Sequence, residues 1–473
     1  MIAGPLLLLV LPLVMAGVVY LVLRWHTLAA LLAVGTAAVL GIAVIYLPVD
    51  EAVAVAGGRQ VAMGETVSFM GRELILEQAD QIGMAYLFFA SAVLFLLAWR
   101  FTPGSLLFPL GLGLLGLLGG ALLIRPLIYA ALLLEIAAAL AVFALQVEGR
   151  PPTRGGLRYL TFTTMALPGL MVTHWLLERY AVTPDETGLL TAAAILLSVS
   201  FAMLLGTVPF HAWVSSVIDD GMPLAGAFVL TVSNGTIWFL LLDFLETYPW
   251  LQGHALFGPV LSAAGLVMVV FGGLLAAGRR RLGPLVGYAS LVDSGAALIA
   301  LGMSSSVGVT LAIFSLLVRP IGLILLASGL SGLRERSGGS DQIEDIQGLG
   351  WKAPWSTAAL ILGTMSVAGW PISAGFVARW ALGRELMAHS PTTALLLLLA
   401  GVAVMMGMWR GLSALLTRPR ESKDRSVFSG VSSEGWVTAV VVIAAMLVCV
   451  GIGLFPQGLA SVAVSLAGGA FLP

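Results

Sequence analysis

The sequence predicts an all-α polytopic membrane protein with about 14 transmembrane helices. The chain is 59% hydrophobic and only 10% charged, with a mean hydropathy of +1.03, whereas a soluble domain carries roughly 25% charged residues. Too little polar surface remains to cover a particle in water, so the solvent must be lipid. The net charge of −1 gives no reason to expect nucleic acid binding. The single cysteine, Cys449, excludes an intrachain disulfide and a cysteine-ligated iron–sulfur cluster.

Fourteen apolar runs approach the length of about 20 residues that a helix needs to cross a bilayer. They occupy residues 3–23, 27–48, 82–100, 105–124, 126–146, 160–181, 188–208, 222–246, 255–278, 283–303, 307–331, 355–385, 392–416 and 435–455. The first run lacks a basic flank, so we expect a retained helix and not a signal peptide. A last apolar stretch, 457–472, is expected to lie at the interface or to pack on the bundle.

The distribution of basic residues predicts the orientation of these helices. Loops after odd-numbered helices hold 15 Lys and Arg residues, and loops after even-numbered helices hold 5. Because basic loops stay on the cytoplasmic side, both termini are expected on the outer side. The longest outer loop, 49–81, is acidic. An error of one helix midway would destroy this alternation, so the charge pattern supports the count of fourteen.

Two of the predicted spans contain a proline beside glycine and polar residues. Pro209 lies at the end of span seven, and Pro371 lies inside span twelve. Proline removes a backbone hydrogen bond, and the freed carbonyls must be buried in protein or line a hydrated cavity. The two breaks are five spans apart, so spans four to eight and nine to thirteen are expected to form two five-helix repeats, the second inverted. Ordinary proline kinks are the alternative.

These patterns predict four segments along the chain. Residues 1–104 carry helices one to three and the acidic loop, and residues 105–250 form the first repeat. Residues 251–420 form the inverted repeat, and residues 421–473 hold helix fourteen and a short apolar tail.

Two carboxylates lie at membrane depth in equivalent spans of the proposed repeats. Glu135 lies midway in span five, and Asp293 lies midway in span ten. A charge at the bilayer centre costs at least about 2.5 kcal/mol, so each is a functional candidate. The alternatives are that Glu135 is a protonated, hydrogen-bonded and inert acid, and that Asp293 forms a purely structural ion pair with Arg319 or Arg379.

Two histidines are the remaining candidates in the spans. His211 follows the break in span seven, where it is either a proton relay or a cap for the broken backbone. His174 lies in span six and is either an accessory polar group or a packing histidine. We find no metal-ligand spacing, catalytic triad or phosphate loop, and expect no cofactor and no chemistry on this chain alone.

Several short motifs over residues 80–415 resemble the antiporter-like membrane subunits shared by respiratory complex I, membrane-bound hydrogenases and Mrp-type sodium/proton antiporters. The motifs are Glu135, the segment Val208-Pro-Phe-His-Ala-Trp213, Gly221-Met-Pro223, Tyr288-Ala-Ser290, Gly348-Leu-Gly350 with Pro354, and Gly369-Trp-Pro371 with Gly375-Phe376. The resemblance implies fourteen helices, a proton-conducting polar axis and partner subunits, including a paralogue or a redox module, in a bacterial or archaeal inner membrane.

The resemblance also implies buried lysines that this chain lacks. The family's span-seven lysine falls at Leu204, and its span-eight lysine falls at Ser233, beside Asn234. The chain's two lysines, Lys352 and Lys423, both lie in hydrophilic loops. Leucine cannot titrate, serine carries no charge, and arginine, which takes the span-twelve position as Arg379, stays protonated. The first half of the expected proton axis is therefore altered more than the second.

Three functions remain open on the sequence. The first is a subunit that translocates or gates protons, or another small cation, coupled to a partner's redox or transport reaction, as in a translocase resembling NADH:quinone oxidoreductase or hydrogenase. Glu135 would be its switchable proton site, with Asp293, Arg319, Arg379 and His211 along the path. The second is a structural or adaptor subunit that has lost transport. The third is a coupling subunit for inorganic carbon uptake.

Overall fold

A computed structural model of the 473-residue chain describes all of it except residues 1, 50–51, 56–58, 70, 102–105, 127, 148–152, 184, 418–433 and 472–473. The chain forms two compact units. Unit 1 consists of Met1–Gly206 and Thr231–Leu251, and unit 2 consists of Thr207–Leu230 and Gln252–Pro473. Lys423 lies outside the described residues. The four-segment division predicted from sequence stays a prediction.

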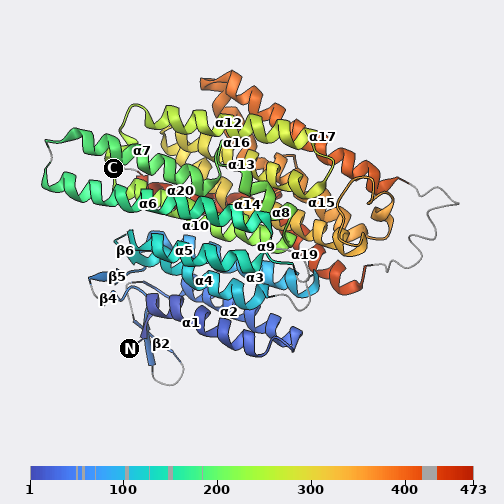
Figure 1. Ribbon diagram of the computed structural model, residues 1–473, viewed down its shortest axis with the longest axis horizontal. Helices are drawn as coiled ribbons and strands as arrows, with labels where there is room; N and C mark the ends of the chain where they lie inside the picture. The colour runs from blue at the N-terminus through green and yellow to red at the C-terminus, as the bar shows by residue number, and fades with distance from the viewer. Residues whose placement is uncertain are drawn as a thin grey trace. The chain divides into compact units, whose positions relative to one another are not determined.

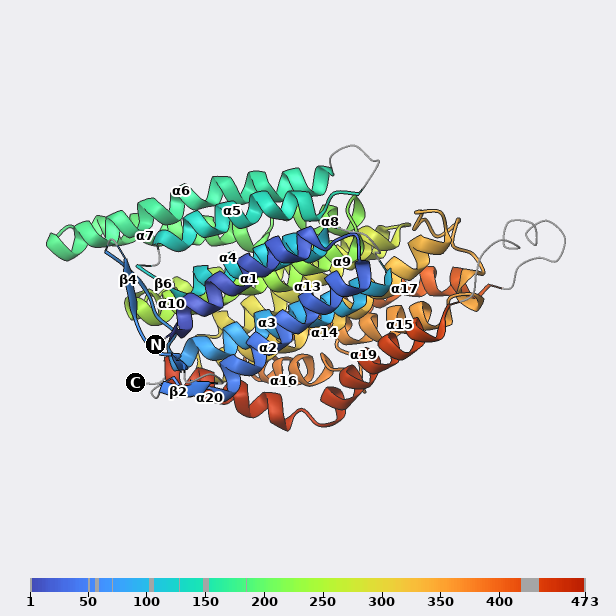
Figure 2. The same cartoon turned by 90° about the horizontal axis from the view of Figure 1, so that it is seen from below.

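Unit 1 is built from long apolar helices (Figure 1). They are α1 (Gly4–Leu21), α2 (His26–Tyr46), α3 (Gln78–Phe101), α4 (Leu107–Leu123), α5 (Ile128–Ala144), α6 (Arg154–Val182), α7 (Thr187–Leu205) and α10 (Asn234–Thr247). Figure 2 shows α6 lying along both α5 and α7. These helices bring Glu135, His174 and Ser233 into the same unit.

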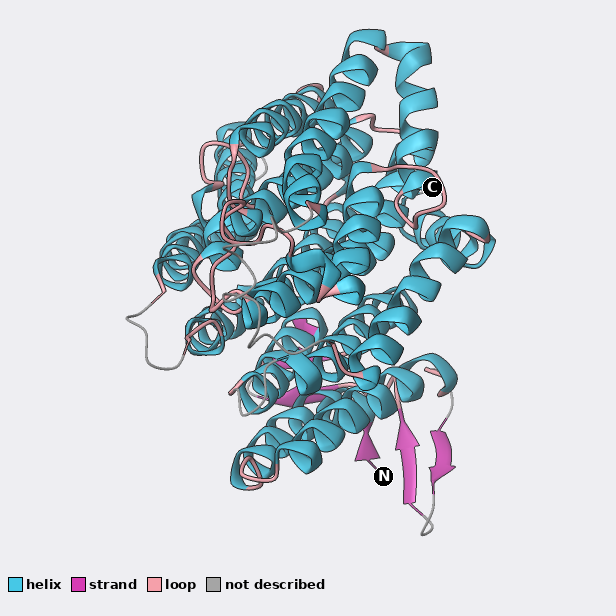
Figure 3. Cartoon of the chain, turned by 90° about the vertical axis from the view of Figure 1, so that its right-hand side faces the viewer, coloured by secondary structure: helices cyan, strands magenta, loops and turns pink. Residues whose placement is uncertain are grey.

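Two small sheets in unit 1 are absent from the all-α prediction. One has the strand order β1 (Ile2–Ala3), β3 (Arg59–Ala62), β2 (Ala52–Val55); the other has the order β4 (Val67–Phe69), β5 (Arg72–Leu74), β6 (Ile124–Arg125). They appear as magenta arrows in Figure 3. Four of these strands lie in the acidic segment 49–81. Each has only three or four residues, which is too short for an alternating apolar pattern to predict a strand.

Among the described residues of unit 2, helices joined by loops make up the structure, apart from one isolated β-bridge between Arg281 and Gln342. Its helices are α8 (Ala212–Asp219), α9 (Pro223–Phe228), α12 (Phe257–Gly278), α13 (Leu282–Gly302), α14 (Ser306–Arg336), α15 (Pro354–Ala368), α16 (Phe376–His389), α17 (Pro391–Leu416), α19 (Trp436–Leu454) and α20 (Gln457–Phe471), with a 3₁₀ turn at Leu349–Trp351. A π-helical turn, Val229–Ser233, joins α9 to α10, and the short α11 (Pro249–Gln252) precedes α12. The apolar tail forms α20, which packs on α14.

The apolar helices make this an integral membrane protein, and each of the fourteen predicted runs contains a helix. Among the described residues, eleven helical segments are long and apolar enough to cross a membrane. The other three predicted spans fall short for a simple reason: α4 and α5 have 17 residues each, and span twelve is split into α15 and α16. Seventeen residues reach about 25 Å, the lower limit for a spanning helix. The count of fourteen therefore stays a prediction.

The helix breaks at Pro209 and Pro371 are full interruptions, not kinks. Gly206 caps the end of α7 and Gly369 caps the end of α15, both in the left-handed region at φ 68° and φ 77°. In each case the glycine N–H bonds back to carbonyls of the last helical turn. Glycine takes this conformation without the penalty that a Cβ brings. The next helices begin only at Ala212 and Phe376.

Glycines bring the backbones of α12 and α13 together. A Cβ added at Gly265 would lie 2.5 Å from the carbonyl oxygen of Gly295, and one added at Gly258 would lie 2.7 Å from that of Gly302. Small residues at helix contacts allow such close approach in a bilayer. Helix α13 carries Asp293, so this packing positions a candidate site residue.

We expect Gly265→Ala to lower the melting temperature of the protein in detergent, because the new methyl group would push α12 away from α13. Overpacking of this kind costs about 1–3 kcal/mol. Gly278→Ala is the matched control on the same helix, since a Cβ there meets nothing within 4 Å. Equal melting temperatures for the two variants would contradict the packing argument.

A buried ion cluster fixes one end of unit 2. Asp341, whose side chain is 0% exposed, accepts hydrogen bonds from Arg334 Nη2 at 2.6 Å, Arg281 Nε at 2.9 Å and the Gly283 backbone N–H at 2.9 Å. Arg334 also donates to the carbonyl of Asp219 at the end of α8. We call Asp341, Arg281 and Arg334 the Asp341 latch. It ties the ends of α8 and α14 to the start of α13.

Burial alone would raise the pKa of Asp341, but the guanidinium groups of Arg334 and Arg281 hold it below its ordinary value. Ionised Asp341 therefore adds stability above the unfolded value of about 3.9, and this contribution is lost as the pH falls through the folded value.

We expect Asp341→Asn to destabilise the protein by about 3–5 kcal/mol at pH 7, because it leaves buried arginines without their carboxylate. The difference from the unchanged protein should shrink below about pH 4. Glu344→Gln is the control, since Glu344 and Arg280 form an exposed pair at 3.7 Å worth less than about 1 kcal/mol. Thermal unfolding measured from pH 3 to pH 8 tests both; a pH-independent difference would contradict this role.

Candidate functional site

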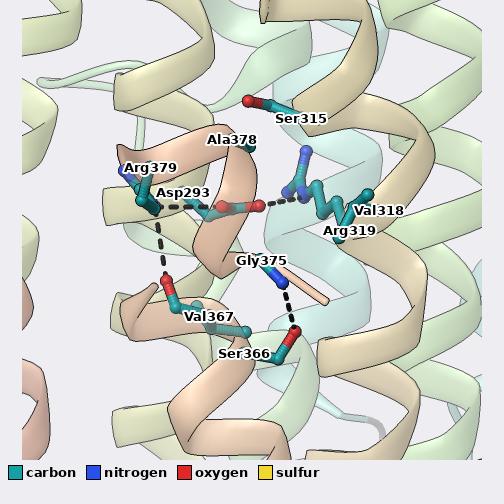
Figure 4. Close-up of a pocket in the computed structure, with 9 residues that line it drawn as sticks. All are labelled: Asp293, Ser315, Val318, Arg319, Ser366, Val367, Gly375, Ala378 and Arg379. Carbon is teal, nitrogen blue, oxygen red and sulfur yellow. Dashed lines mark hydrogen bonds and ion pairs between the residues drawn. The ribbon is translucent and has the colours of Figure 1, made fainter. Parts of the chain in front are cut away.

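Asp293 lies between two arginines in the interior of unit 2 (Figure 4). Its Oδ1 accepts a hydrogen bond from Arg379 Nη2 at 2.9 Å, and its Oδ2 lies 3.6 Å from Arg319 Nε. The three side chains are 14%, 11% and 3% exposed for Asp293, Arg379 and Arg319. We call these three residues the Asp293 site. The sequence left open which arginine would pair with Asp293, and the structure pairs it with both.

The Asp293 site takes one residue from each of three helices, α13, α14 and α16. Asp293 is midway along α13, a helix with 94% of its length buried. Arg319 precedes Pro320 within α14 and also donates to Ser290 Oγ at 2.8 Å. Arg379 lies in the first turns of α16, directly after the break.

Arg379 also satisfies the broken backbone. Its Nη2 donates to the carbonyl oxygen of Val367 at 3.3 Å, in the last turn of α15. That carbonyl belongs to a helix end, where it has no partner within the helix. Gly369 leaves the space for this arrangement, because a Cβ there would collide with Cβ and Cγ of Arg379. Arg379 therefore connects the break in span twelve to the Asp293 site.

A small cavity of about 10 Å³ opens beside the Asp293 site, room for about one water-sized body. It is lined by Asp293, Ser315, Val318, Arg319, Ser366, Val367, Gly375, Ala378 and Arg379. The Gly375 N–H donates to Ser366 Oγ at 3.2 Å. Two of these nine residues are cationic and one is anionic, so the lining carries a formal charge of +1.

Glu135 occupies a separate place in unit 1. It is half-buried on α5, and its Oε1 accepts a hydrogen bond from Thr164 Oγ1 on α6 at 2.7 Å. Its Oε2 is buried and has no hydrogen-bond partner among the described residues. Half of the carboxylate is thus held in place, while the other oxygen can accept a proton or a water. No described contact joins it to His174.

The two positions expected to carry lysine are buried and uncharged. Leu204 is 4% exposed and Ser233 is 1% exposed. Asn234 donates from Nδ2 to the Leu204 carbonyl at 3.5 Å, so the two positions are neighbours. The π-helical turn disturbs the regular ladder here, and the Tyr86 hydroxyl donates to the Thr231 carbonyl at 3.0 Å.

The histidines do not join either carboxylate in any described contact. His211 is half-buried at the start of α8, and its side chain makes no capping hydrogen bond. Its Nδ1 is buried without a hydrogen-bond partner among the described residues. His174 Nε2 lies 3.2 Å from Glu178 Oε1 on the same helix. The roles of His211 as a relay or as a cap for the broken backbone both stay predictions.

Sequence reasoning missed a third charged group, in unit 1. Arg125 Nη2 lies 3.6 Å from Asp80 Oδ2, and Arg125 Nη1 lies 3.3 Å from Asp243 Oδ2. All three side chains are 14–21% exposed. The signal that could have found the group was Asp80 and Asp243 near the ends of two spans, with Arg125 in the loop between spans four and five.

Comparison with known proteins places the chain near one group of membrane proteins. The family described as NADH:quinone oxidoreductase/Mrp antiporter, TM, matches residues 159–407, more than half of the chain. NADH-quinone oxidoreductase subunit N of Methylococcus capsulatus is 26% identical over 346 residues, covering 69% of this chain and 68% of that protein. Subunit N 1 of Solidesulfovibrio magneticus is 29% identical over 340 residues, covering 70% and 72%.

Solved structures share the fold over nearly the whole chain. A chain of the Mrp complex from a Dietzia species aligns with a TM-score of 0.83 at 17% identity, covering 99% of this chain and 97% of that chain. A chain of respiratory complex I from Thermus thermophilus aligns with a TM-score of 0.75 at 19% identity, covering 98% and 99%. At these identities the likeness establishes the fold alone.

We expect Asp293 and Arg379 to be energetically coupled. In a double-mutant cycle of Asp293→Asn and Arg379→Gln, the double variant should be more stable than the sum of the single losses implies, with a coupling energy of about 1–3 kcal/mol. Asp293→Asn removes the carboxylate that Arg379 contacts, and Arg379→Gln leaves Asp293 with the longer contact to Arg319. Arg280→Gln with Glu344→Gln is the exposed control pair, and its coupling should be near zero. Melting temperatures of all variants in one detergent test this.

Proposed function

Because this chain belongs to the NADH:quinone oxidoreductase/Mrp antiporter family, we propose that it is an antiporter-like subunit of a larger membrane complex, in which it translocates or gates protons. The Asp293 site is the observation that carries this proposal. It holds an ionisable carboxylate in the interior, beside a helix break and a water-sized cavity. Ionisable groups at membrane depth are costly, and they mark proton and ion pathways.

The residues of the path divide into groups that can exchange a proton and groups that cannot. Glu135 is the switchable proton site in unit 1, because one carboxylate oxygen is held by Thr164 and the other is buried without a partner among the described residues. Asp293 is the second carboxylate. Arg319 and Arg379 stay protonated, so they act as fixed charges that bias Asp293.

His211 serves in this proposal as a relay next to the break in span seven. It is half-buried, and neutral imidazole can both donate and accept a proton. The accessory groups are Ser233 and Asn234, which border the irregular π-helical turn, and His174. Serine and asparagine can hold a water molecule in a pathway but cannot carry the charge.

Two inverted five-helix repeats are part of the same proposal. The breaks after Gly206 and Gly369 share a left-handed glycine cap, a proline two or three residues later and a following short helix. Such a match between spans seven and twelve is expected if the spans are copies. We place both termini on the outer side, on the basis of the loop charges.

The partners in this proposal are other membrane subunits, including a paralogous subunit and a redox or transport module. The relatives named above are subunits of NADH-quinone oxidoreductase, and the similar solved chains come from the Mrp complex and from complex I. Energy from a partner's reaction would drive or be driven by the proton movement, since we find no redox motif on this chain.

A transport-inactive scaffold is the second candidate, and one observation favours it. Leu204 and Ser233 are both buried, and neither can ionise. A proton path through unit 1 would have to pass them on water molecules alone. The two candidate functions make different predictions for Glu135: its substitution changes proton flux in a transporter and leaves it unchanged in a scaffold.

We expect Glu135→Gln to lower proton flux at least tenfold in liposomes that contain the complete complex, because glutamine keeps the shape and the hydrogen bond to Thr164 but cannot bind a proton. Glu186→Gln is the control, since Glu186 is 52% exposed and pairs with Arg179 at 3.6 Å. The measurement is a pH-sensitive dye inside the liposomes during turnover of the partner.

Unchanged flux in Glu135→Gln, with full assembly of the complex, would refute the role of Glu135 and favour the scaffold. Loss of assembly in this variant would be detected by size-exclusion chromatography. In that case Glu135→Asp provides the second measurement: flux should persist at a reduced level, because the acid remains.

A further inference from the structure

Three exposed arginines lie together where α12 and α17 end. Arg279 and Arg280 directly follow α12, and Arg410 lies near the end of α17. Arg410 reaches across to α12, where its Nη2 donates to the carbonyl oxygen of Arg279 at 3.1 Å and to that of Ala277. These contacts satisfy carbonyls at the end of a helix, which lack partners within it. We call Arg279, Arg280 and Arg410 the arginine patch.

Close packing of α12 and α17 fixes the position of the patch (Figure 1). A Cβ added at Gly273 would lie 2.9 Å from Cα of Ala400, and one added at Gly407 would lie 2.5 Å from the carbonyl oxygen of Ala276. The contacts advance in the same direction along both helices, so the helices run parallel and end on the same side. The second contact lies about one helical turn before the arginines, so the backbone keeps the arginines together.

Most of the positive charge of the patch has no carboxylate partner among the described residues. Arg279 Nη2 donates to the hydroxyl of Tyr288 at 3.0 Å, and Arg410 bonds to carbonyls. Of the three arginines, only Arg280 forms a described ion pair, with Glu344 at 3.7 Å, and this pair is exposed. The next arginine in the chain belongs to the Asp341 latch. Three guanidinium groups and one carboxylate leave the patch with a formal charge of +2.

Exposed apolar side chains lead along both helices to the patch. Leu274 of α12 is 68% exposed, and Met406 and Trp409 of α17 are 61% and 70% exposed. Val402, Met406 and Trp409 are four and three residues apart, so they share one face of α17. Both helices are long and apolar enough to cross a membrane, so this face contacts the hydrocarbon chains of lipid. Tryptophan is favoured where hydrocarbon meets headgroups.

We propose that the arginine patch binds an anionic diacyl phospholipid, whose phosphate contacts the guanidinium groups and whose acyl chains lie along the exposed face of α12 and α17. Guanidinium groups form paired hydrogen bonds with phosphate oxygens, and basic side chains next to a membrane helix attract anionic headgroups. Positive charge at the end of an apolar face is complementary to a lipid, whereas a soluble phosphate would leave the apolar face unused. This site goes beyond the proposed function and does not depend on proton movement.

The test is a titration of the purified full-length protein in dodecyl maltoside with phosphatidylglycerol or with phosphatidylcholine of the same acyl chains. Bound lipid is counted by native mass spectrometry. We expect saturable binding of phosphatidylglycerol, at least tenfold tighter than that of phosphatidylcholine, and no competition from inorganic phosphate at equal concentration. Equal affinities for the two lipids overturn the proposal, and they are the result expected if the patch serves a partner protein instead. Competition by inorganic phosphate also overturns it, because the site would then belong to a free anion.

Substitutions in the patch separate this site from lipid bound elsewhere. Each arginine near an anionic headgroup contributes about fivefold in affinity, so Arg279→Gln and Arg410→Gln should each weaken phosphatidylglycerol binding by that factor. Arg24→Gln is the matched control, because Arg24 is also an exposed arginine, next to the exposed Trp25 and just after α1, but in unit 1. Equal affinities in the patch variants and in the control overturn the proposal.

Two further variants at the exposed pair complete the test. If Arg410→Gln does not fold, Arg280→Gln replaces it: Arg280 is 83% exposed, so this variant should fold and bind phosphatidylglycerol about fivefold more weakly. Glu344→Gln should change the affinity in the opposite direction, because it removes the one carboxylate paired with the patch. At low ionic strength, where charges are least screened, it should bind phosphatidylglycerol at least twofold more tightly. Unchanged or weaker binding in Glu344→Gln contradicts the site.

Discussion

The contact of one carboxylate with two guanidinium groups is the interaction on which the interior of unit 2 depends. Arg319 and Arg379 come from α14 and α16, and Asp293 comes from α13. Without the carboxylate, two permanent charges would face each other in a place where each is expensive. Because the three residues belong to three helices, their pairing also determines how these helices meet. Charge and packing are thus satisfied by the same contacts.

The helix break in span twelve makes this interaction possible. An unbroken helix has no free carbonyl in its interior for Arg379 to contact, and its bulk would fill the space that Gly369 leaves. The interruption presents the Val367 carbonyl to Arg379, and the carbonyl and Asp293 then share one guanidinium group. The cost of the lost helical hydrogen bonds is offset by this charged partner. The broken backbone gives Arg379 a carbonyl acceptor, and Arg379 gives that carbonyl a hydrogen-bond donor.

The positions where the resemblance implies buried charged groups differ between the two units. In unit 1, Leu204 and Ser233 replace the expected cations with groups that cannot titrate, and Glu135 keeps only Thr164 as a described side-chain partner. In unit 2, Arg379 takes the span-twelve position where the resemblance implies a lysine or a glutamate, and arginine keeps its positive charge.

The sequence by itself determined the membrane setting, the positions of the apolar helices and the two breaks, because hydrophobic length and proline act locally along the chain. It also identified Asp293, Arg319 and Arg379, since any charge inside an apolar run is conspicuous. Only the tertiary structure decided that Asp293 contacts both arginines, that Arg125 joins Asp80 to Asp243, and that Asp341 is fully buried in an apparent loop. These contacts join residues from 7 to 118 positions apart in the chain. Helical periodicity describes only neighbours within a helix, so the partners of a buried charge follow from how the helices pack.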